Sequence, residues 1–194
     1  MSKTLDGLMQ AFVGECQARN RYTFYASIAR KEGFEQIAAI FSLTADNEKE
    51  HASWFYKMMK EVAEKEEIDI NKLIIETPVP FMLSVTADNV DASIVGETYE
   101  YTEMYPEISA QALKDGYPKI AARVRAIANA EKHHAERYGK ILANLKGETV
   151  FKKEENVYWV CRECGYLHFG KMAPKECPSC GHAQSFFEVN CEQF

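Results

Sequence analysis

Apolar residues recur every three or four positions through most of the first 146 residues. This spacing predicts amphipathic helices, because such residues share one helical face. The pattern is interrupted at Gly33, in the stretch Asp115 to Pro118, and over segment 66–85, which contains Pro78 and Pro80. We therefore predict four long helices, at 4–31, 35–65, 86–114 and 118–145.

The connection between the second and third predicted helices differs from the other two. Segment 66–85 is long enough to run the length of a helical bundle and return the chain to the end from which the second helix started. The pattern therefore predicts a mainly α fold, a four-helix bundle with one long crossover.

The pattern changes again near the C-terminus. From Val157 onward, short aromatic and β-branched runs alternate with Cys-Gly and Cys-Pro turns, which indicates short β-strands. Most residues just before Val157 are polar or charged. We predict a bundle domain at 1–147, a linker at 148–156 and a small second domain at 157–194. Its expected aromatic core is Trp159, Tyr166, Phe186 and Phe187.

The first region contains an internal repeat with an offset of 83 residues. The segment beginning at Gly33 aligns without gaps to the segment beginning at Gly116, so that Glu48 falls on Glu131 and His51 on His134. With a shift of one residue, Glu15 falls on Glu97. Each half is then a helical hairpin that carries a Glu followed by a Glu-x-x-His. Two similar halves predict a pseudo-twofold site between them.

Ionisable residues interrupt the apolar face of every predicted helix at a similar level. Five buried carboxylates would lose hydration and repel one another, so an apolar core requires cations beside them. Two ferrous ions, or two ferric ions with one oxide, balance five carboxylates to within one charge. This is the di-iron carboxylate arrangement of ferritin-like bundles. The candidate metal and catalytic residues are Glu15, Glu48, His51, Glu97, Glu100, Glu131 and His134.

Some of these residues and their neighbours also permit other interpretations. A single Glu-x-x-His is usually a surface pair, but two in register within apolar faces favour metal. Tyr22 and Tyr105 lie near the ligand level and either hydrogen-bond to carboxylates or donate protons, or only pack in the core. Cys16 is interpreted as a small buried residue rather than a ligand. Cys191 is interpreted as a stray thiol near the C-terminus.

Two CxxC pairs in the last fifth of the chain form a second candidate site. Four thiolates from two tight turns bind one metal tetrahedrally, and spacing alone permits iron or zinc. A one-electron iron site would have a function beside a di-iron bundle, whereas zinc would only stabilise a small domain. We therefore favour a single iron. The candidate ligands are Cys161, Cys164, Cys177 and Cys180.

Composition and charge exclude other classes. The chain has 23 basic and 29 acidic residues and no basic tract, so nucleic acid is not an expected partner. There is no long apolar segment and no export signal at Met1 to Gly14, and paired cysteines suit metal binding in a reducing compartment. We expect a cytoplasmic protein without a membrane partner.

Several stretches resemble rubrerythrins in order and spacing. They are GECQARNRY from Gly14, EKEH ending at His51, GETYEYTEMYP from Gly96, AEKHH ending at His134, and the turns CRECGY and CPSCG. The resemblance covers nearly the whole chain. It implies a rubredoxin-like C-terminal domain, two irons on the seven Glu and His residues and one on the four cysteines, hence three irons per chain. It also implies a homodimer.

The resemblance further implies an activity. Rubrerythrins are hydrogen peroxide reductases that receive electrons from an NAD(P)H-dependent reductase, often through rubredoxin. We expect the four-cysteine iron to relay these electrons to the di-iron site. The resemblance also implies that Glu100 and His51 exchange as ligands on reduction. The alternatives are a ferroxidase or iron-storage protein of the ferritin type, and a non-catalytic metal-binding module with zinc. Neither alternative needs a built-in electron relay.

Overall fold

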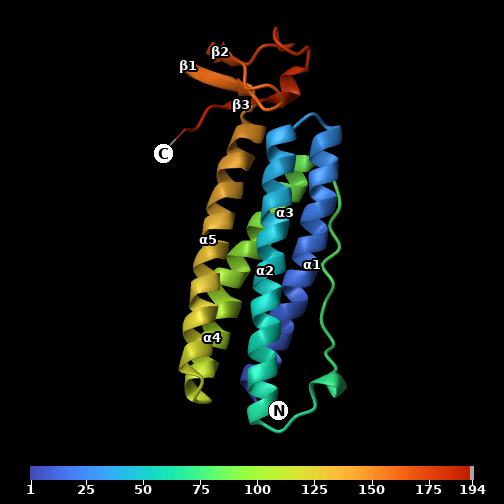
Figure 1. The fold of residues 1–194 in the computed structure, drawn as a ribbon, viewed down its shortest axis with the longest axis vertical. Helices are drawn as coiled ribbons and strands as arrows, with labels where there is room; N and C mark the ends of the chain where they lie inside the picture. Colours follow the sequence, from blue (N-terminus) through green and yellow to red (C-terminus); the bar gives the residue numbers. More distant parts are fainter. Residues whose placement is uncertain (193–194) are drawn as a thin grey trace.

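The computed structural model describes residues 1–192 and forms an elongated helical bundle with a small domain at one end (Figure 1). The first helical hairpin is α1 (Lys3–Lys31) and α2 (Glu35–Lys65). In the second hairpin, one arm is α3 (Thr86–Tyr99) followed by α4 (Tyr105–Lys114), and the other arm is α5 (Pro118–Lys146). The prediction of a mainly α, ferritin-like bundle with one long crossover is confirmed.

The two hairpin turns have the same geometry, which matches the internal repeat. Gly33 and Gly116 both have φ +83°, in the left-handed region that glycine adopts without steric cost. The next residue bonds back in each case: the Phe34 N–H donates to the Ala29 carbonyl at 2.8 Å, and the equivalent bond at Tyr117 is 2.7 Å. This Schellman pattern ends a helix and reverses the chain.

The predicted helix 86–114 is not one continuous α-helix, and this prediction was wrong in detail. A π-helical segment, Glu100–Met104, separates α3 from α4. A π-turn takes in one extra residue and shifts the direction of the side chains that follow it. Periodicity counted at 3.6 residues per turn does not detect a single added residue, so the directions of the side chains that follow Glu100 could not be predicted from it.

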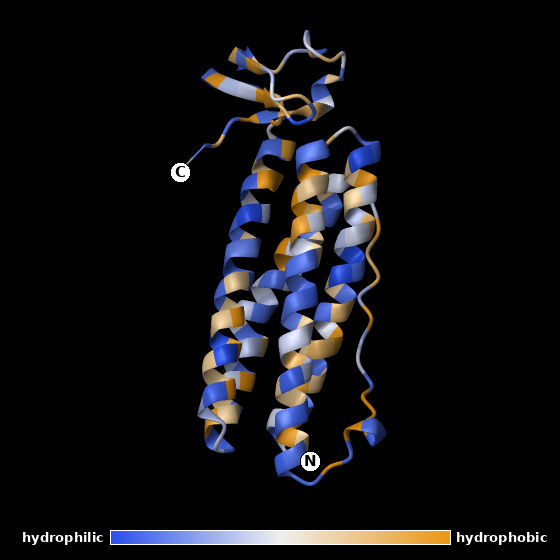
Figure 2. Cartoon of the chain, viewed as in Figure 1, coloured by the Kyte–Doolittle hydropathy of each residue, from blue (hydrophilic) through white to orange (hydrophobic). Residues whose placement is uncertain are grey.

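The bundle core consists of two apolar clusters. One contains Leu8, Phe55 and Val124, and the other contains Phe41 and Tyr138. The ionisable residues of the candidate site lie along the same helices, between these clusters in sequence. Figure 2 shows extensive hydrophilic residues along the helices, as expected for faces in contact with water. The site is therefore enclosed by apolar packing at both ends.

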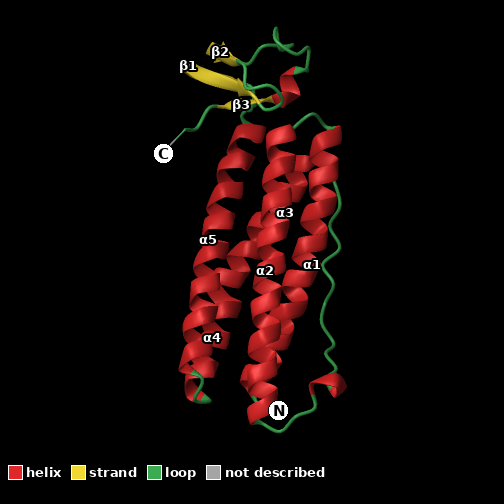
Figure 3. Cartoon of the chain, in the orientation of Figure 1, coloured by secondary structure: helices red, strands yellow, loops and turns green. Residues whose placement is uncertain are grey.

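The crossover runs along the outside of α1 (Figure 3). It contains one short 3-10 turn, Ile70–Lys72, and otherwise has no regular helix or strand. The Tyr25 hydroxyl donates to the Met82 carbonyl at 2.9 Å and ties the crossover to α1. No helix within residues 1–192 is long and apolar enough to cross a membrane.

The small domain is a three-stranded antiparallel sheet with strand order β2-β1-β3. The predicted aromatic core is confirmed: Trp159 and Phe187 are buried, and Tyr166 and Phe186 pack against them. The first strand starts before Val157, so it overlaps the end of the segment 148–156 expected as a linker. Phe34 of the bundle and Phe151 stack with ring centroids 6.2 Å apart, which seats the domain on the bundle. The strands are β1 (Lys152–Cys161), β2 (Leu167–Met172) and β3 (Phe187–Val189).

Candidate metal centres

Six ionisable side chains from four helices converge inside the bundle. They form two groups, and in each group one potential ligand atom per residue lies within 4.8 Å of all the others. Glu48 of α2 and Glu131 of α5 belong to both groups. The first group is Glu15, Glu48, His51 and Glu131, and the second is Glu48, Glu97, Glu131 and His134.

The two shared carboxylates lie between the two histidines. His51 Nδ1 is 2.9 Å from Glu48 Oε2 and 2.9 Å from Glu131 Oε1. His134 Nδ1 is 2.9 Å from Glu131 Oε2 and 3.3 Å from Glu48 Oε1. Each carboxylate thus directs one oxygen toward each histidine, which is the arrangement required to bridge two cations.

The remaining two carboxylates each lie beside one histidine. Glu15 Oε1 is 3.6 Å from His51 Nδ1, and Glu97 Oε2 is 3.4 Å from His134 Nδ1. The site therefore has the pseudo-twofold symmetry that the repeat predicts. Each half of it combines one terminal carboxylate and one imidazole with the two shared carboxylates.

Two tyrosines connect the halves of the repeat. The Tyr105 hydroxyl donates to Glu15 Oε1 at 2.5 Å, and the Tyr22 hydroxyl donates to Glu97 Oε1. Tyr22 and Tyr105 are equivalent at the offset of 83, so each half supplies the hydroxyl that orients the other half's terminal carboxylate. Both interpretations of these tyrosines hold, because each hydroxyl donates to a carboxylate and each ring is buried in an apolar cluster of the core.

The donor atoms fit cations rather than a hydrogen-bonded network. Buried polar atoms in folded proteins nearly always have hydrogen-bond partners, so a convergent set without them needs an explanation. Carboxylate oxygens and imidazole nitrogens are ligands that suit iron. Within residues 1–192, the buried atoms of the site that lack a hydrogen-bond partner are Glu15 Oε2, Glu97 Oε2, both carboxylate oxygens of Glu48 and Glu131, and Nδ1 of His51 and His134.

The pKa values of the site also indicate that its buried carboxylates lack compensating positive charge. Burial raises the pKa of Glu97 to about 8, and burial together with the charges of Glu131 and Glu48 holds the pKa of Glu15 well above its usual range. Burial lowers the pKa of His134, but the nearby carboxylates outweigh it and raise the value to about 12. Without cations the site must therefore hold extra protons, and cations would replace them.

Glu100 lies beside this site but belongs to neither group of four. It is half-buried at the start of the π-helical segment, and its Oε1 is 3.9 Å from the position that a Cβ would take on Gly14. Its charge contributes to the raised pKa of Glu15, after burial and the charges of Glu131 and Glu48. Cys16 is half-buried and also lies outside both groups.

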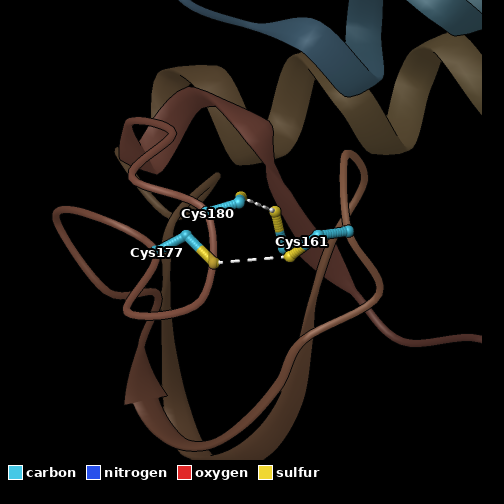
Figure 4. A group of neighbouring side chains, drawn as sticks. Cys161, Cys177 and Cys180 are labelled. Atoms are coloured by element: carbon cyan, nitrogen blue, oxygen red, sulfur yellow. Dashed lines mark hydrogen bonds between the residues drawn. The ribbon is translucent and has the colours of Figure 1, made fainter.

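The four paired cysteines form the second cluster, with their Sγ atoms within 4.8 Å of one another. Cys161 Sγ is 3.8 Å from Cys180 Sγ, and Cys164 Sγ is 3.7 Å from Cys177 Sγ. Figure 4 shows Cys161, Cys177 and Cys180 pointing toward one another from two turns. None is in a disulfide, and Cys164 is exposed. Four convergent sulfurs provide a tetrahedral metal site.

The backbone around the sulfurs favours thiolates. Gly165 and Gly181 follow the second cysteine of each pair and have φ of +76° and +73°, which turns the chain tightly around each CxxC. The Tyr166 N–H is the main cause that lowers the pKa of Cys164 to about 6. The His182 N–H lowers the pKa of Cys180, but burial and the neighbouring sulfurs raise it to about 12. A metal ion would remove this competition for protons.

A bundle in which two helices each supply a Glu and two others each supply a Glu-x-x-His defines the class of ferritin-like di-iron carboxylate proteins. Here a four-cysteine domain is attached. The family model for rubrerythrin matches residues 6–142, and the model for the rubrerythrin rubredoxin-like domain matches residues 159–188. The chain belongs to the rubrerythrin family, and the two clusters are consistent with three irons per chain.

Individual relatives agree over the full length. A Methanocaldococcus jannaschii relative is 51% identical, with 100% of this chain and 96% of the relative covered. Rubrerythrin-1 of Clostridium acetobutylicum is 44% identical, with 100% and 97% covered. Among solved structures, partially reduced nigerythrin matches with a TM-score of 0.63 and 29% identity, covering 98% of this chain and 88% of that one. The family supports an oxidoreductase activity.

Proposed function

We propose that this chain is a hydrogen peroxide reductase of the rubrerythrin type. The observation that supports it is the presence, in one chain, of a buried two-cation carboxylate site and a four-cysteine site with an exposed sulfur ligand. The proposed domains are the bundle at 1–147, the linker at 148–156 and the iron domain at 157–194. The proposed di-iron ligands are Glu15, Glu48, His51, Glu97, Glu100, Glu131 and His134, and the single-iron ligands are Cys161, Cys164, Cys177 and Cys180.

Two bound ferrous ions would supply the two electrons that, with two protons, convert one hydrogen peroxide to two water molecules. The chain's own residues prepare the site for this reaction. Apolar residues such as Phe41 and Phe55, both 0% exposed, exclude bulk water. Tyr22 and Tyr105 keep one oxygen of Glu97 and Glu15 occupied, which leaves the other oxygen free to bind metal.

The four-cysteine domain would receive electrons from outside. Cys164 is exposed at the surface of the small domain, where an NAD(P)H-linked reductase or rubredoxin can approach its sulfur. Cys161 and Cys177 are buried, so half of the cluster is shielded from water. Steady-state reduction of peroxide by the full chain with such a donor tests this proposal directly, and no turnover with any donor would contradict it.

We also propose a homodimer in which the small domain of one chain serves the bundle of the other. From Glu131, α5 continues for fifteen residues to Lys146, roughly 22 Å at 1.5 Å per residue, before the small domain begins. A chain's own four-cysteine site is therefore far from its own carboxylates. The crossover exposes apolar side chains, with Phe81 97% and Val79 69% exposed, and such patches favour association.

Metal analysis of protein from the native organism should find three irons per chain. Removal of the cysteine site by substitution of Cys164 and Cys180 with serine should leave two, because the bundle ligands are separate from the cysteines. The check is total iron per chain, with visible absorption of the iron–thiolate site. Stable zinc in the four-cysteine site would contradict an electron relay.

Transfer between chains can be tested with mixed dimers. A chain with Cys164→Ser and Cys180→Ser lacks the relay, and a chain with Glu131→Ala lacks a shared carboxylate. Each homodimer should be inactive. Mixed dimers should recover up to about half of the wild-type turnover, because only one of the two relay–bundle combinations is intact. The absence of recovery in verified mixed dimers would rule out transfer between chains.

A further inference from the structure

The two helices that supply the shared carboxylates belong to different hairpins. Glu48 lies on α2, which packs closely along α1, whereas Glu131 lies on α5, which packs along α3 and α4. Backbone approach between α2 and α5 is much more limited. The separation of these two helices sets the distance between the shared carboxylates, so contacts that fix it also determine the geometry of the metal site.

One such contact lies on the His134 side of the site. Arg137 Nη2 donates to Thr44 Oγ1 at 2.7 Å, from α5 to α2. Thr44 is buried, and its hydroxyl donates to the Ile40 carbonyl at 2.9 Å, so its oxygen is free to accept from the guanidinium. Thr44 precedes Glu48 by four residues, and Arg137 follows His134 by three. The contact is therefore about one helical turn from each of these ligands.

A second contact lies on the His51 side. The Arg123 guanidinium of α5 lies 4.0 Å from the centre of the Trp54 ring of α2, within the range of a cation–π interaction. Trp54 follows His51 by three residues. The helices α2 and α5 are antiparallel (Figure 1). From the order of these residues along the two helices, this contact and the Arg137–Thr44 contact lie on opposite sides of the ligands.

The internal repeat relates the two contacts. Trp54 and Arg137 occupy equivalent positions at the offset of 83, each three residues after the histidine of its half. Each reaches across to the helix of the other half. The position thus makes a contact between α2 and α5 in both halves, with an aromatic ring in one half and a guanidinium in the other. This symmetry is independent of the ligands themselves.

We propose that these two cross-helix contacts position the two metal ions separately. Arg137–Thr44 fixes the position formed by Glu97 and His134, and Arg123–Trp54 fixes the position formed by Glu15 and His51. The proposal rests on the proposed di-iron site, which it deepens. Residues that orient ligands without touching the metal affect metal affinity by about 10- to 100-fold.

The first test uses Thr44, whose substitution changes no charge. Full-length chain with iron already in the four-cysteine site is titrated anaerobically with ferrous iron by calorimetry. Wild type should bind two further ions. Thr44→Val, which keeps the side-chain shape but removes the acceptor, should bind one ion normally and the other about tenfold more weakly. Thr44→Ser, which keeps the oxygen, should restore wild-type binding.

The second test uses Arg123. Arg123→Ala should weaken binding of the other ion, beside His51. Arg125→Ala is the matched control because it removes another exposed arginine from the same helix. Crystals soaked in limiting manganese should lose anomalous signal beside His134 in Thr44→Val and beside His51 in Arg123→Ala. The double variant with Thr44→Val and Arg123→Ala should bind both ions more weakly.

Thermal unfolding of the metal-free variants shows whether a substitution destabilises the fold or changes only the affinity for metal. If Thr44→Val unfolds too early to titrate, Arg137→Met should give the selective loss, and Arg137→Gln, which keeps a donor without the charge, should retain binding. Wild-type affinity for both ions in Thr44→Val and Arg123→Ala, or equal effects of Arg123→Ala and Arg125→Ala, would overturn the inference. Failure of the wild-type bundle to bind two ions would instead overturn the proposed function.

Discussion

Substitution of Cys164 and Cys180 with serine should abolish steady-state peroxide reduction while leaving one oxidation of pre-reduced protein intact. Loss of two of four thiolates removes the metal from the small domain, so turnover with an external donor should fall by at least about two orders of magnitude. The bundle should be unaffected, because its ligands lie on other elements. The measurements are donor oxidation under turnover and stopped-flow oxidation of the chemically reduced protein.

Cys191→Ser provides the control for this experiment, because Cys191 is exposed and lies outside the four-cysteine cluster. It should turn over like wild type. The choice of Cys164 and Cys180 leaves the two buried cysteines in the core of the small domain. If the double variant keeps the wild-type turnover, electrons enter the bundle directly, and the proposed relay is wrong.

Substitution of Glu100 with alanine should give the second large effect. The bundle should still bind two irons, because six ligands outside Glu100 already form both groups of four. Peroxide turnover should fall by about 10- to 100-fold, whereas oxidation by dioxygen should change much less. Glu100 has no equivalent in the other half of the repeat, since Glu97 already corresponds to Glu15. One iron therefore has a choice between Glu100 and His51, and Glu100→Ala removes this exchange of ligands. The measurements are iron content per chain, the rate of peroxide turnover and the rate of oxidation by dioxygen.

Glu103→Ala is the matched control, since Glu103 is an exposed carboxylate in the same π-helical segment. It should leave both rates unchanged. Peroxide turnover of Glu100→Ala at the wild-type rate would show that the extra carboxylate is structural. Crystal structures of the oxidised and reduced protein with the same ligands on both irons would refute the exchange of Glu100 with His51.

Most of the candidate site could be predicted from the sequence for two reasons. The ligand pattern occurs twice at one offset, and burial of ionisable side chains in an apolar core costs free energy unless cations compensate it. Glu48 and His51 interrupt an apolar helical face, and Glu131 and His134 repeat the interruption at the same offset. Burial of such groups requires compensation, which the pattern therefore reveals. The structure brings these four together with Glu15 and Glu97, while Glu50 and His133, one residue away from ligand positions, are exposed.

Other features depend on contacts that no local pattern specifies. The π-helical segment Glu100–Met104 adds one residue to a turn. Pro106 follows two residues after its end, but helical periodicity does not detect the added residue. The start of β1 at Lys152 depends on pairing with Met172, which lies far along the chain. The Arg137–Thr44 contact joins residues that are both polar and lie on separate helices, so helical periodicity alone cannot relate them.

The ferritin-type alternative uses the same bundle chemistry and differs in the oxidant. A ferroxidase oxidises ferrous iron with dioxygen and has no need of the four-cysteine cluster in residues 161–180. A peroxidase reacts preferentially with peroxide and must be re-reduced after each turnover. The oxidant preference of the reduced bundle therefore separates the two functions.

The most direct test mixes anaerobically reduced full-length protein with hydrogen peroxide and, separately, with dioxygen, and follows iron oxidation in the bundle by stopped-flow absorption. A peroxide reductase should oxidise at least about tenfold faster with peroxide and consume one peroxide for each pair of ferrous ions. Faster oxidation by dioxygen than by peroxide would contradict the account and assign the bundle to ferroxidase chemistry.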